Sequence, residues 1–231
     1  RRLRRLALLV LVMLVGLAAF ALTRSPVLDL DHIGVQGVEG QQMSEVRTVS
    51  GLTLGSPLLD VAPASVAAKV ENLAWVRSAA VTRHWPGSVQ IDITPRVPVA
   101  TAAHGADTVA IDRTGQVIGP VTGSSVLPSL DLTPPAVGQT VPAPWRSALA
   151  VVADLPAPLL AEVTSARVGS AGIELTLQDG IEVRFGDASR LRAKSVALEA
   201  LLDRAGRSSI RSIDVRVPAN PSLTRTPGGG A

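Results

Sequence analysis

The sequence of 231 residues contains no cysteine and no tyrosine, and aromatic residues make up only 2% of it. Without cysteine, the chain cannot form disulfides, use thiol catalysis or bind a metal through thiolates. With so few aromatic side chains, it also lacks the stacking surface that proteins use to hold single-stranded nucleic acid. These absences leave the hydrophobic core to hold the fold and argue against binding of single-stranded nucleic acid.

Basic residues are numerous but not clustered along most of the chain. Four of the 22 Lys and Arg residues lie in the first five positions, which leaves 18 basic against 19 acidic residues elsewhere. A nucleic-acid binding surface requires concentrated positive charge, and the pI of about 10.4 therefore does not indicate one. Arg outnumbers Lys strongly and Ala is abundant, a pattern that we interpret as the mark of a GC-rich genome.

The most hydrophobic part of the sequence is the uncharged run from Leu6 to Leu22. As a helix of 1.5 Å rise per residue it would be roughly 26 Å long, slightly short of the ~30 Å hydrocarbon core of a bilayer. We therefore predict a transmembrane helix over residues 6–23, after a cytoplasmic stub of residues 1–5. The expected membrane-contacting residues are Leu6, Leu9, Leu14, Phe20 and Leu22.

The flanking charges predict the orientation of this helix. RRLRR precedes the apolar run, whereas Arg24 is followed by Asp29 and Asp31. The positive-inside rule then places the N-terminus in the cytoplasm and the rest of the chain outside it, as a single-pass plasma-membrane protein. The alternative is a cleaved signal peptide, since Ala19-Phe20-Ala21 fits the small-x-small pattern and cleavage would free an exported binding protein.

Residues 28–96 predict a compact α+β domain. Asp29 to Gly37 has the pattern of a strand, and helices are expected over residues 43–49 and from about 60 to Leu73. Two further strands, at residues 75–83 and 89–93, are joined by the turn-forming segment His84 to Ser88. The predicted order is strand, helix, helix, strand, strand, and Pro95 and Pro98 mark the boundary that follows.

Residues 97–217 predict a second, mostly antiparallel β-domain with one or two helices. Short strands alternate with turns, and helices are expected at residues 145–155 and 191–202. The Pro- and Gly-rich stretch at residues 119–144 is predicted to be a long surface excursion. Ser209 to Val217 alternates as a final strand with Ile213, Val215 and Val217 on one face, and residues 218–231 are expected to form a disordered tail.

Residues suited to catalysis or metal binding are sparse. The three histidines, His32, His84 and His104, have no ligand spacing and no cysteine to supplement them. The chain has no Gly-x-Ser-x-Gly motif, and the Gly-rich stretch at residues 51–56 lacks the lysine of a phosphate loop. Asp112 and Asp179 lie in predicted turns, where Asp ordinarily accepts backbone hydrogen bonds. The sequence thus predicts no cofactor, metal or small-molecule substrate.

An ordered set of short motifs resembles the FtsQ/DivIB family of bacterial cell-division proteins. The most specific is Trp75-Val76 followed by Val81-Thr82-Arg83-His84-Trp85-Pro86-Gly87-Ser88-Val89. Weaker matches stand in the same order along the rest of the chain: Val35-Gln36-Gly37, Gly55-Ser56-Pro57-Leu58 with Asp60, Arg96-Val97-Pro98-Val99-Ala100, Ile111-Asp112 with Gly115, Asp179-Gly180, Lys194 and Ile213-Asp214-Val215-Arg216. Pro95 departs from the family pattern, in which a Glu often precedes the Arg, and we expect the strand to end early there or to run along an edge.

The resemblance implies a fold and a function. Residues 28–96 would be an FtsQ-type POTRA domain and residues 97–217 the β-domain of the family. The implied function is that of a non-enzymatic scaffold at the division septum, which binds FtsB and FtsL and helps to localise or regulate septal peptidoglycan synthesis, with septal wall synthases as further possible partners. The alternatives are a membrane-anchored cell-wall hydrolase or transferase, and a POTRA-bearing outer-membrane assembly component.

The last strand is the expected partner-binding site, because the resemblance implies that FtsB adds a strand at the end of the β-domain. An edge strand offers unpaired N–H and C=O groups to a partner. Arg211 and Arg216 would pair with acidic groups of that partner. The full set of candidate contacts is Arg211, Ile213, Asp214, Val215, Arg216, Val217 and Lys194. The alternative for the strand is that it is internal and that Arg216 is merely solvated, and for Lys194 it is the solvated face of its helix.

Overall fold

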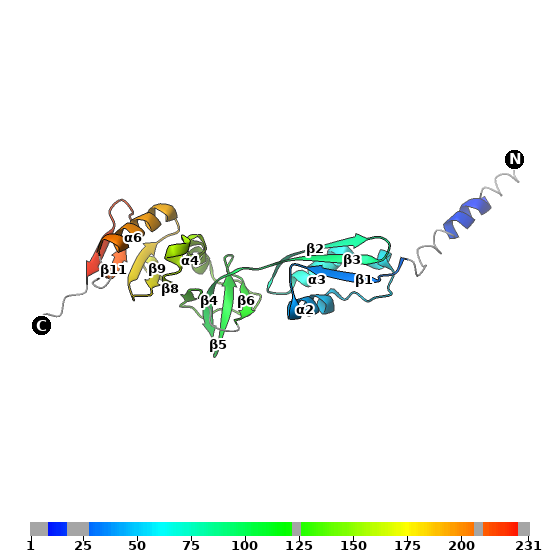
Figure 1. Cartoon of the computed structure of the whole chain (residues 1–231), viewed down its shortest axis with the longest axis horizontal. Coiled ribbons are helices and arrows are strands. Elements are labelled where there is room, and N and C mark those ends of the chain that lie inside the picture. The colour runs from blue at the N-terminus through cyan, green and yellow to red at the C-terminus, as the bar shows by residue number, and fades with distance from the viewer. Residues whose placement is uncertain (1–8, 18–27, 122–125, 206–209, 226–231) are drawn as a thin grey trace. The chain divides into compact units, whose positions relative to one another are not determined.

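The computed structural model describes residues 9–17, 28–121, 126–205 and 210–225, and it divides into two compact units, Arg1–Pro95 and Arg96–Ala231. Figure 1 shows the elements of each unit. The mixed α+β class expected from the sequence is confirmed in both units. Each is described by itself below, as the first unit and the second unit.

The first unit contains the expected order of strand, helix, helix, strand, strand. Its elements are β1 (His32–Gln36), α2 (Gly40–Ser50), the short 3-10 helix Leu58–Asp60, α3 (Pro63–Glu71), β2 (Val76–His84) and β3 (Ser88–Pro95). The sheet order is β1-β3-β2, in which β1 runs parallel and β2 antiparallel to β3. The order arises because a tight hairpin joins β2 to β3, whereas the two helices carry the chain from β1 across to β2.

The core of the first unit forms where the apolar faces of these elements meet. Val66 and Val70, four residues apart on α3, are buried together with Val89, Ile91 and Ile93 of β3. The alternation of residues 89–93 is therefore that of a strand with one buried face. Pro95 ends β3 beyond its pairing with β1, so the missing N–H of this proline interrupts no pairing with β1.

The second unit is built on a nine-stranded sheet. Its strands are β4 (Pro98–His104), β5 (Asp107–Asp112), β6 (Val117–Pro120), β7 (Ser129–Leu130), β8 (Val163–Gly169), β9 (Gly172–Leu177), β10 (Glu182–Gly186), β11 (Ile210–Asp214) and β12 (Ser222–Arg225). Its helices are α4 (Ala143–Asp154), α5 (Ala157–Leu160) and α6 (Leu191–Ala205). The strand order across the described part of the sheet is β12-β11-β10-β9-β8-β7-β4-β5-β6.

Most pairings in this sheet are antiparallel, as the sequence predicts, but β7 pairs parallel with both β4 and β8. The expectation that residues 119–144 form only a surface excursion is therefore wrong. Leu130 of β7 and Val141 are 2% exposed, and the N–H of Thr101 donates to the carbonyl of Pro128 at 2.9 Å. This segment supplies β7, which lies between β8 and β4 and so connects the two parts of the sheet. The sequence does not reveal β7, because a strand of two residues is too short to show alternation.

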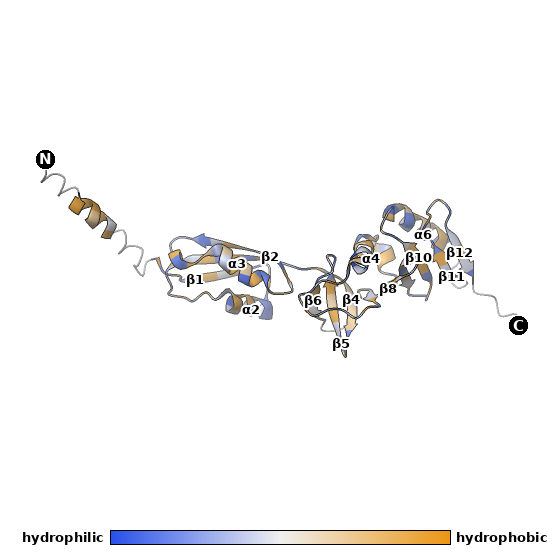
Figure 2. Ribbon diagram, turned by 180° about the vertical axis from the view of Figure 1, so that it is seen from behind, coloured by the Kyte–Doolittle hydropathy of each residue, from blue (hydrophilic) through white to orange (hydrophobic). Residues whose placement is uncertain are grey.

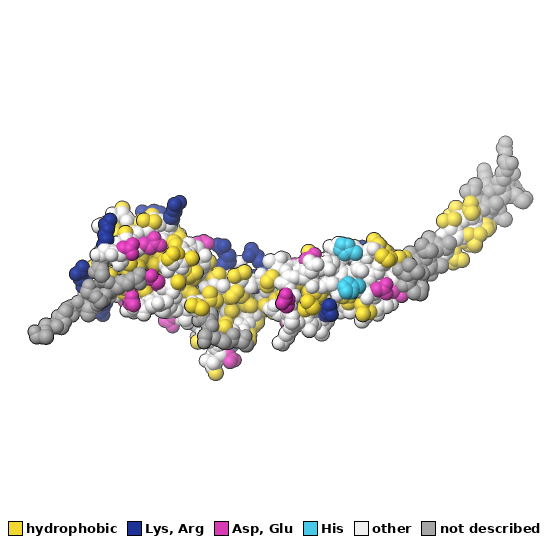
Figure 3. Space-filling model, viewed as in Figure 1, with side chains coloured by type: hydrophobic (Ala, Val, Ile, Leu, Met, Phe, Trp, Pro, Cys, Tyr) yellow, Lys and Arg dark blue, Asp and Glu magenta, His cyan; other side chains and the backbone are white. Residues whose placement is uncertain are grey.

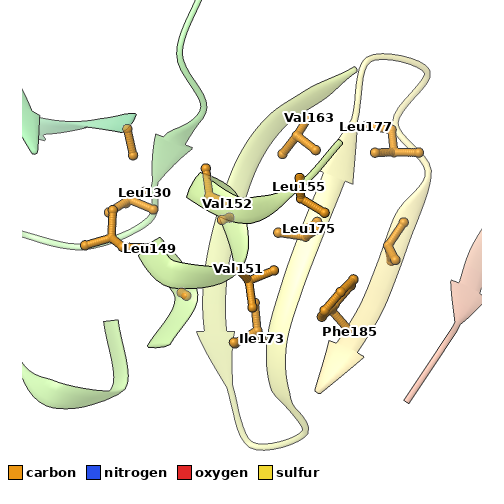
Figure 4. Packing of buried hydrophobic residues seen from close by; sticks show 14 of the residues in the cluster. Leu130, Leu149, Val151, Val152, Leu155, Val163, Ile173, Leu175, Leu177 and Phe185 are labelled. Atoms are coloured by element: carbon orange, nitrogen blue, oxygen red, sulfur yellow. The ribbon is translucent and has the colours of Figure 1, made fainter. Parts of the chain in front are cut away.

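The core of the second unit lies between the sheet and its helices. Figure 4 shows Val151 of α4 beside Ile173 of β9, and Leu155, the residue after α4, beside Leu175 of the same strand. Phe185 of β10 and Leu198 of α6 are fully buried in the same cluster. In Figure 2 hydrophobic residues concentrate in the strands, whereas α6 carries many hydrophilic residues.

Residues 9–17 form a helical segment that is hydrophobic along most of its length (Figure 2) and solvent-exposed. It includes Leu9 and Leu14, whereas Leu6, Phe20, Leu22 and the stub 1–5 lie outside the described residues. Among the helices of the described ranges, none combines the length and the apolar character needed to cross a membrane.

Candidate functional site

The end of the second sheet is formed by two strands, β11 and β12. β11 pairs parallel with β10 on one side and antiparallel with β12 on the other, with Ile213 opposite Leu223 and Asp214 opposite Ser222. The expectation that the strand at 209–217 is the sheet edge is therefore wrong, and so is the expectation of disorder across all of 218–231. Within the part of the chain that the structure describes, β12 is the edge at this end of the sheet, and β6 is the edge at the other end.

β12 is a short strand whose sequence alternates between polar and apolar residues. Ser222 and Thr224 are exposed, whereas Leu223 is partly buried against the main core of the second unit. The run Ser-Leu-Thr alternates in the sequence, but the surrounding Pro and Gly residues and the brevity of the run favour an interpretation as disordered tail. The edge of the sheet thus lies about ten residues further along the chain than the sequence predicts.

The candidate contact residues on and after β11 have different environments. Ile213 and Val215 are fully buried, so they support the strand and cannot contact a partner directly. Val217 is 54% exposed, because β11 ends at Asp214 and the predicted alternation does not continue to 217. Arg211 is exposed at the register shift between Ile210 and Ser212, at the same end of the ribbon as the exposed Arg225.

Arg216 is engaged by its own chain. Its Nε lies 3.0 Å from both carboxylate oxygens of Asp214, its Nη2 lies 2.6 Å from Oδ2, and its backbone N–H also donates to Oδ1. The hydrogen bonds from Arg216 hold the pKa of the Asp214 carboxyl below its ordinary value, and the pKa of Arg216 is raised in return. The pair closes the end of β11, so the expected role of Arg216 as a partner contact is not supported by its geometry.

Lys194 is buried, so neither the predicted partner contact nor a solvated helix face describes its environment. It is only 1% exposed, and its Nζ donates to the carbonyl oxygen of Asp187 at 2.8 Å and to its Oδ1 at 2.6 Å. The same ammonium lies 5.2 Å from the centre of the Phe185 ring. Lys194 therefore fastens the loop between β10 and α6 onto the core. The sequence could not show this, because a lysine on a helix is usually solvated.

The solvent face of the sheet carries a row of alternating charges. Arg167, Glu174, Arg184 and Asp214 stand opposite one another on β8, β9, β10 and β11. Arg167 Nε donates to Glu174 Oε2 at 2.6 Å, and the row ends in the Asp214–Arg216 pair. A cleft of about 520 Å³ lies over this row and is also lined by Asp131 and Glu182. Neighbouring charges in the row have opposite sign, so they attract one another across the strands and stabilise the sheet.

An apolar cleft adjoins the segment that leads into β12. Leu191, Ala193 and Val196 of α6 line it together with Pro218 and Ala219. Val196 is 58% exposed and adds apolar surface to this cleft. Ala219 stands three residues before Ser222, so the cleft lies close along the chain to the start of β12.

Several acidic side chains form hydrogen bonds within the fold, and those that the structure describes do not gather into a metal site. Among the described residues, no three His, Asp or Glu side chains come close enough together to hold a metal ion. Asp112 is buried in the β5–β6 turn, where its Oδ1 accepts hydrogen bonds from the Thr114 and Gln116 N–H groups, and its Oδ2 accepts one from Arg96 Nη1 at 2.7 Å. The turn expected at Asp112 is thus confirmed, with Arg96 as an additional partner.

Comparisons with known proteins identify both units. The model of the POTRA domain, FtsQ-type, matches residues 28–96, and that of the C-terminal part of cell division protein FtsQ/DivIB matches residues 100–216. The units therefore define a POTRA-bearing cell-division protein. The chain belongs to the FtsQ/DivIB family.

Individual relatives are bacterial division proteins. Cell division protein FtsQ of Streptomyces collinus is 31% identical over 96% of this chain and 88% of its own length. FtsQ of Mycolicibacterium smegmatis is 32% identical over 86% of this chain, which spans only 58% of that relative. The extracytoplasmic domain of DivIB from Geobacillus stearothermophilus is 21% identical, with a TM-score of 0.33 over 48% of this chain and 98% of that domain.

Proposed function

We propose that this protein is a non-enzymatic scaffold of the bacterial division apparatus, which binds FtsB- and FtsL-type proteins and helps to localise or regulate septal peptidoglycan synthesis. The observation that carries the proposal is the short edge strand β12 at the end of the second sheet. Membership of the FtsQ/DivIB family supports a role in division. Septal wall synthases are further candidate partners.

The proposed contact is addition of a partner strand along β12. An edge strand presents N–H and C=O groups that a partner strand can pair with, and short edge strands limit unwanted pairing. Arg211 and Arg225 are exposed at one end of the β11–β12 ribbon and would favour an acidic partner segment. The apolar cleft at Val196 and Ala219 offers adjoining area for the same partner.

The proposed location is the plasma membrane at the septum. The apolar run Leu6–Leu22 would anchor the chain, with the N-terminus in the cytoplasm and the residues after Thr23 outside. Domain limits of 28–96 and 97–217 are proposed for the POTRA domain and the β-domain, with β12 as an extension of the latter.

A binding assay with proline variants tests the proposed edge. Successive N–H groups of a strand point to opposite sides. Thr224→Pro and Arg225→Pro therefore remove two different donors: one N–H that pairs with β11 and one N–H that faces away from the sheet. Only the loss of the outward N–H is expected to leave the fold intact. The full chain would be titrated with the extracytoplasmic parts of FtsB and FtsL, and folding checked by circular dichroism. We expect the variant that folds normally to lose binding.

A charge reversal provides the matched control. Arg225→Glu should weaken binding, whereas Arg77→Glu, an equal change at an exposed position of β2 in the first unit, should leave it unchanged. Normal binding by a folded edge-proline variant would rule out β12 as the contact. Absence of binding by the unaltered chain would contradict the scaffold function itself.

A further inference from the structure

Three large hydrophobic side chains are exposed on loops of the first unit. Leu54 is 65% exposed in the loop after α2, Leu59 is 42% exposed in the 3-10 helix, and Trp85 is 56% exposed in the β2–β3 hairpin. None of these positions belongs to the core of the unit, which lies between the sheet and the two helices. Exposed apolar side chains that gather at one place, unlike ones scattered singly, commonly mark an interaction surface.

Backbone hydrogen bonds join these loops to Leu30, Asp31 and His32, at the start of the sheet-bearing part of the first unit. The Leu30 N–H donates to the carbonyl of Ser56 at 2.8 Å, and the Gly55 N–H donates to the carbonyl of Leu30 at 2.9 Å. Leu54 is the residue before Gly55, so this loop tip is held beside the start of the unit.

The hairpin that carries Trp85 is fastened at the same place. Both Asp31 and His32 donate backbone N–H bonds to the carbonyl of Gly87, at 2.7 and 3.1 Å. Gly87 packs so closely that a Cβ there would lie 2.6 Å from the carbonyl oxygen of Asp29. Arg83 Nη1 donates to the carbonyl of Leu59 at 3.4 Å, which links the third apolar residue to this hairpin.

Leu54, Leu59 and Trp85 therefore occupy one end of the first unit, the end at which the chain enters it; we name these three residues the entry tip. Figure 3 shows hydrophobic side chains at this end of the unit, and Figure 1 shows that β1 begins and β2 ends there. The entry tip is not covered by any other described segment, since all three side chains remain substantially exposed.

The length of the preceding chain limits how far the entry tip can lie from a bilayer. Leu22 ends the apolar run, and six residues separate it from Asp29. Even fully extended, six residues reach only about 20 Å. If the run spans the membrane, as proposed above, the entry tip is confined close to the outer surface of that membrane.

We propose that the entry tip inserts into the headgroup region of the membrane that anchors the chain. Trp is one of the side chains enriched at membrane–water interfaces, and leucines beside it add apolar area for the acyl boundary. Arg83 provides one positive charge nearby, while Asp29 and Asp31 provide negative ones, so apolar contact and not charge attraction is the driving force. The tip would hold the POTRA domain against the bilayer, at a fixed height for its partners.

Single-cysteine labelling tests this contact, because the chain has no cysteine of its own. Leu54→Cys in the full chain would carry a polarity-sensitive NBD fluorophore in vesicles of phosphatidylethanolamine and phosphatidylglycerol. His104→Cys, at the exposed β4–β5 turn of the second unit, is the matched control. We expect a blue shift and quenching by headgroup-proximal doxyl lipid at position 54 and neither at position 104. Adding Trp85→Ser and Leu59→Ser should reduce the quenching at 54.

Flotation of the same vesicles measures whether the chain is bound to the membrane at all. It therefore distinguishes failure of the proposed entry-tip contact from failure of the proposed membrane anchor, on which the contact depends. Chain that floats without quenching at position 54 would overturn the entry-tip contact and leave the anchor intact. Chain that does not float would overturn both. Shielding of the position-54 label from aqueous quencher by a partner protein, without lipid quenching, would identify the tip as a protein contact and overturn the proposal as well.

Discussion

The guanidinium of Arg216 holds both carboxylate oxygens of Asp214, two residues earlier, with Nε 3.0 Å from Oδ1 and Nη2 2.6 Å from Oδ2. The pair lies where β11 ends, so it is part of the structure of the sheet and not a free contact for a partner. We therefore predict that Arg216→Gln slightly lowers the thermal midpoint of the second unit and leaves binding of FtsB- and FtsL-type proteins nearly unchanged. Calorimetry measures the thermal midpoint, and the binding titration measures the affinity for the partners. Arg225→Gln is the comparison, because it is expected to weaken binding without changing the thermal midpoint.

The Asp112 carboxylate accepts hydrogen bonds from the β5–β6 turn and from Arg96, the first residue of the second unit. Burial raises its pKa, but hydrogen bonds from Thr114, Arg96 and Gln116 outweigh this and hold the pKa below its ordinary value. Asp112→Ala would leave Arg96, only 15% exposed, without its counter-ion, at a cost of about 3 kcal/mol. Asp112→Asn keeps an acceptor for the turn and should cost less. Urea denaturation of the full chain measures both; equal losses would contradict the importance of the charge.

Lys194 and Asp187 predict a pH dependence of stability. Hydrogen bonds from Lys194 and Ser189 lower the pKa of the Asp187 carboxyl well below 3.8. A group whose pKa is depressed in the folded state contributes stability above its unfolded pKa and loses it as pH falls through the folded value. The stability difference between the unaltered protein and Asp187→Asn should therefore be constant from pH 7 to 5 and shrink below about pH 4. A difference that stays constant at low pH would show that the carboxylate charge does not contribute.

The sequence predicts the first unit well because its signals are local. The alternation at residues 89–93, the helical spacing of Val66 and Val70, and the turn-forming residues at 84–88 each act within a few residues. The family resemblance then predicts how these elements combine, and the family match at 28–96 agrees.

The second unit is harder to predict because its decisive features depend on distant pairing. Strand β7 has only two residues and gains its structure from β4 and β8, about 30 residues away on either side. β12 exists because β11 offers it an edge, and Lys194 is buried because Asp187 and Phe185 receive it. Periodicity reports which face of an element is apolar, but it does not report which strand lies last in a sheet.

Gly37 ends β1 with a φ of +89°, and a Cβ there would lie 2.0 Å from the carbonyl oxygen of Ile93. Gly55 has a similar φ of +81° but open space around its Cα, so it serves as the matched control. Gly55→Ala should cost about 1–2 kcal/mol from the left-handed conformation alone. Gly37→Ala should cost clearly more, because β1 must also move away from β3. Denaturant midpoints of the two variants compare the costs, and equal values would mean that the backbone yields without penalty.

The charge row on the open face of the second sheet can be tested at its centre. Arg184 stands between Glu174 and Asp214 on the neighbouring strands, so Arg184→Glu places three negative charges side by side. Like charges opposite one another in a sheet are unfavourable, and we expect a loss of about 0.5–1 kcal/mol in dilute buffer. Arg184→Gln, which removes the attraction without adding repulsion, should lose less. Because Arg184 is exposed and Glu174 and Asp214 remain in part accessible to solvent, the difference between the two variants should fall as salt rises from about 0.02 to about 0.5 M, where the screening length drops below the strand spacing. Urea denaturation at both salt concentrations measures it. A difference that does not respond to salt would mean that side-chain packing, and not charge, decides the effect at position 184.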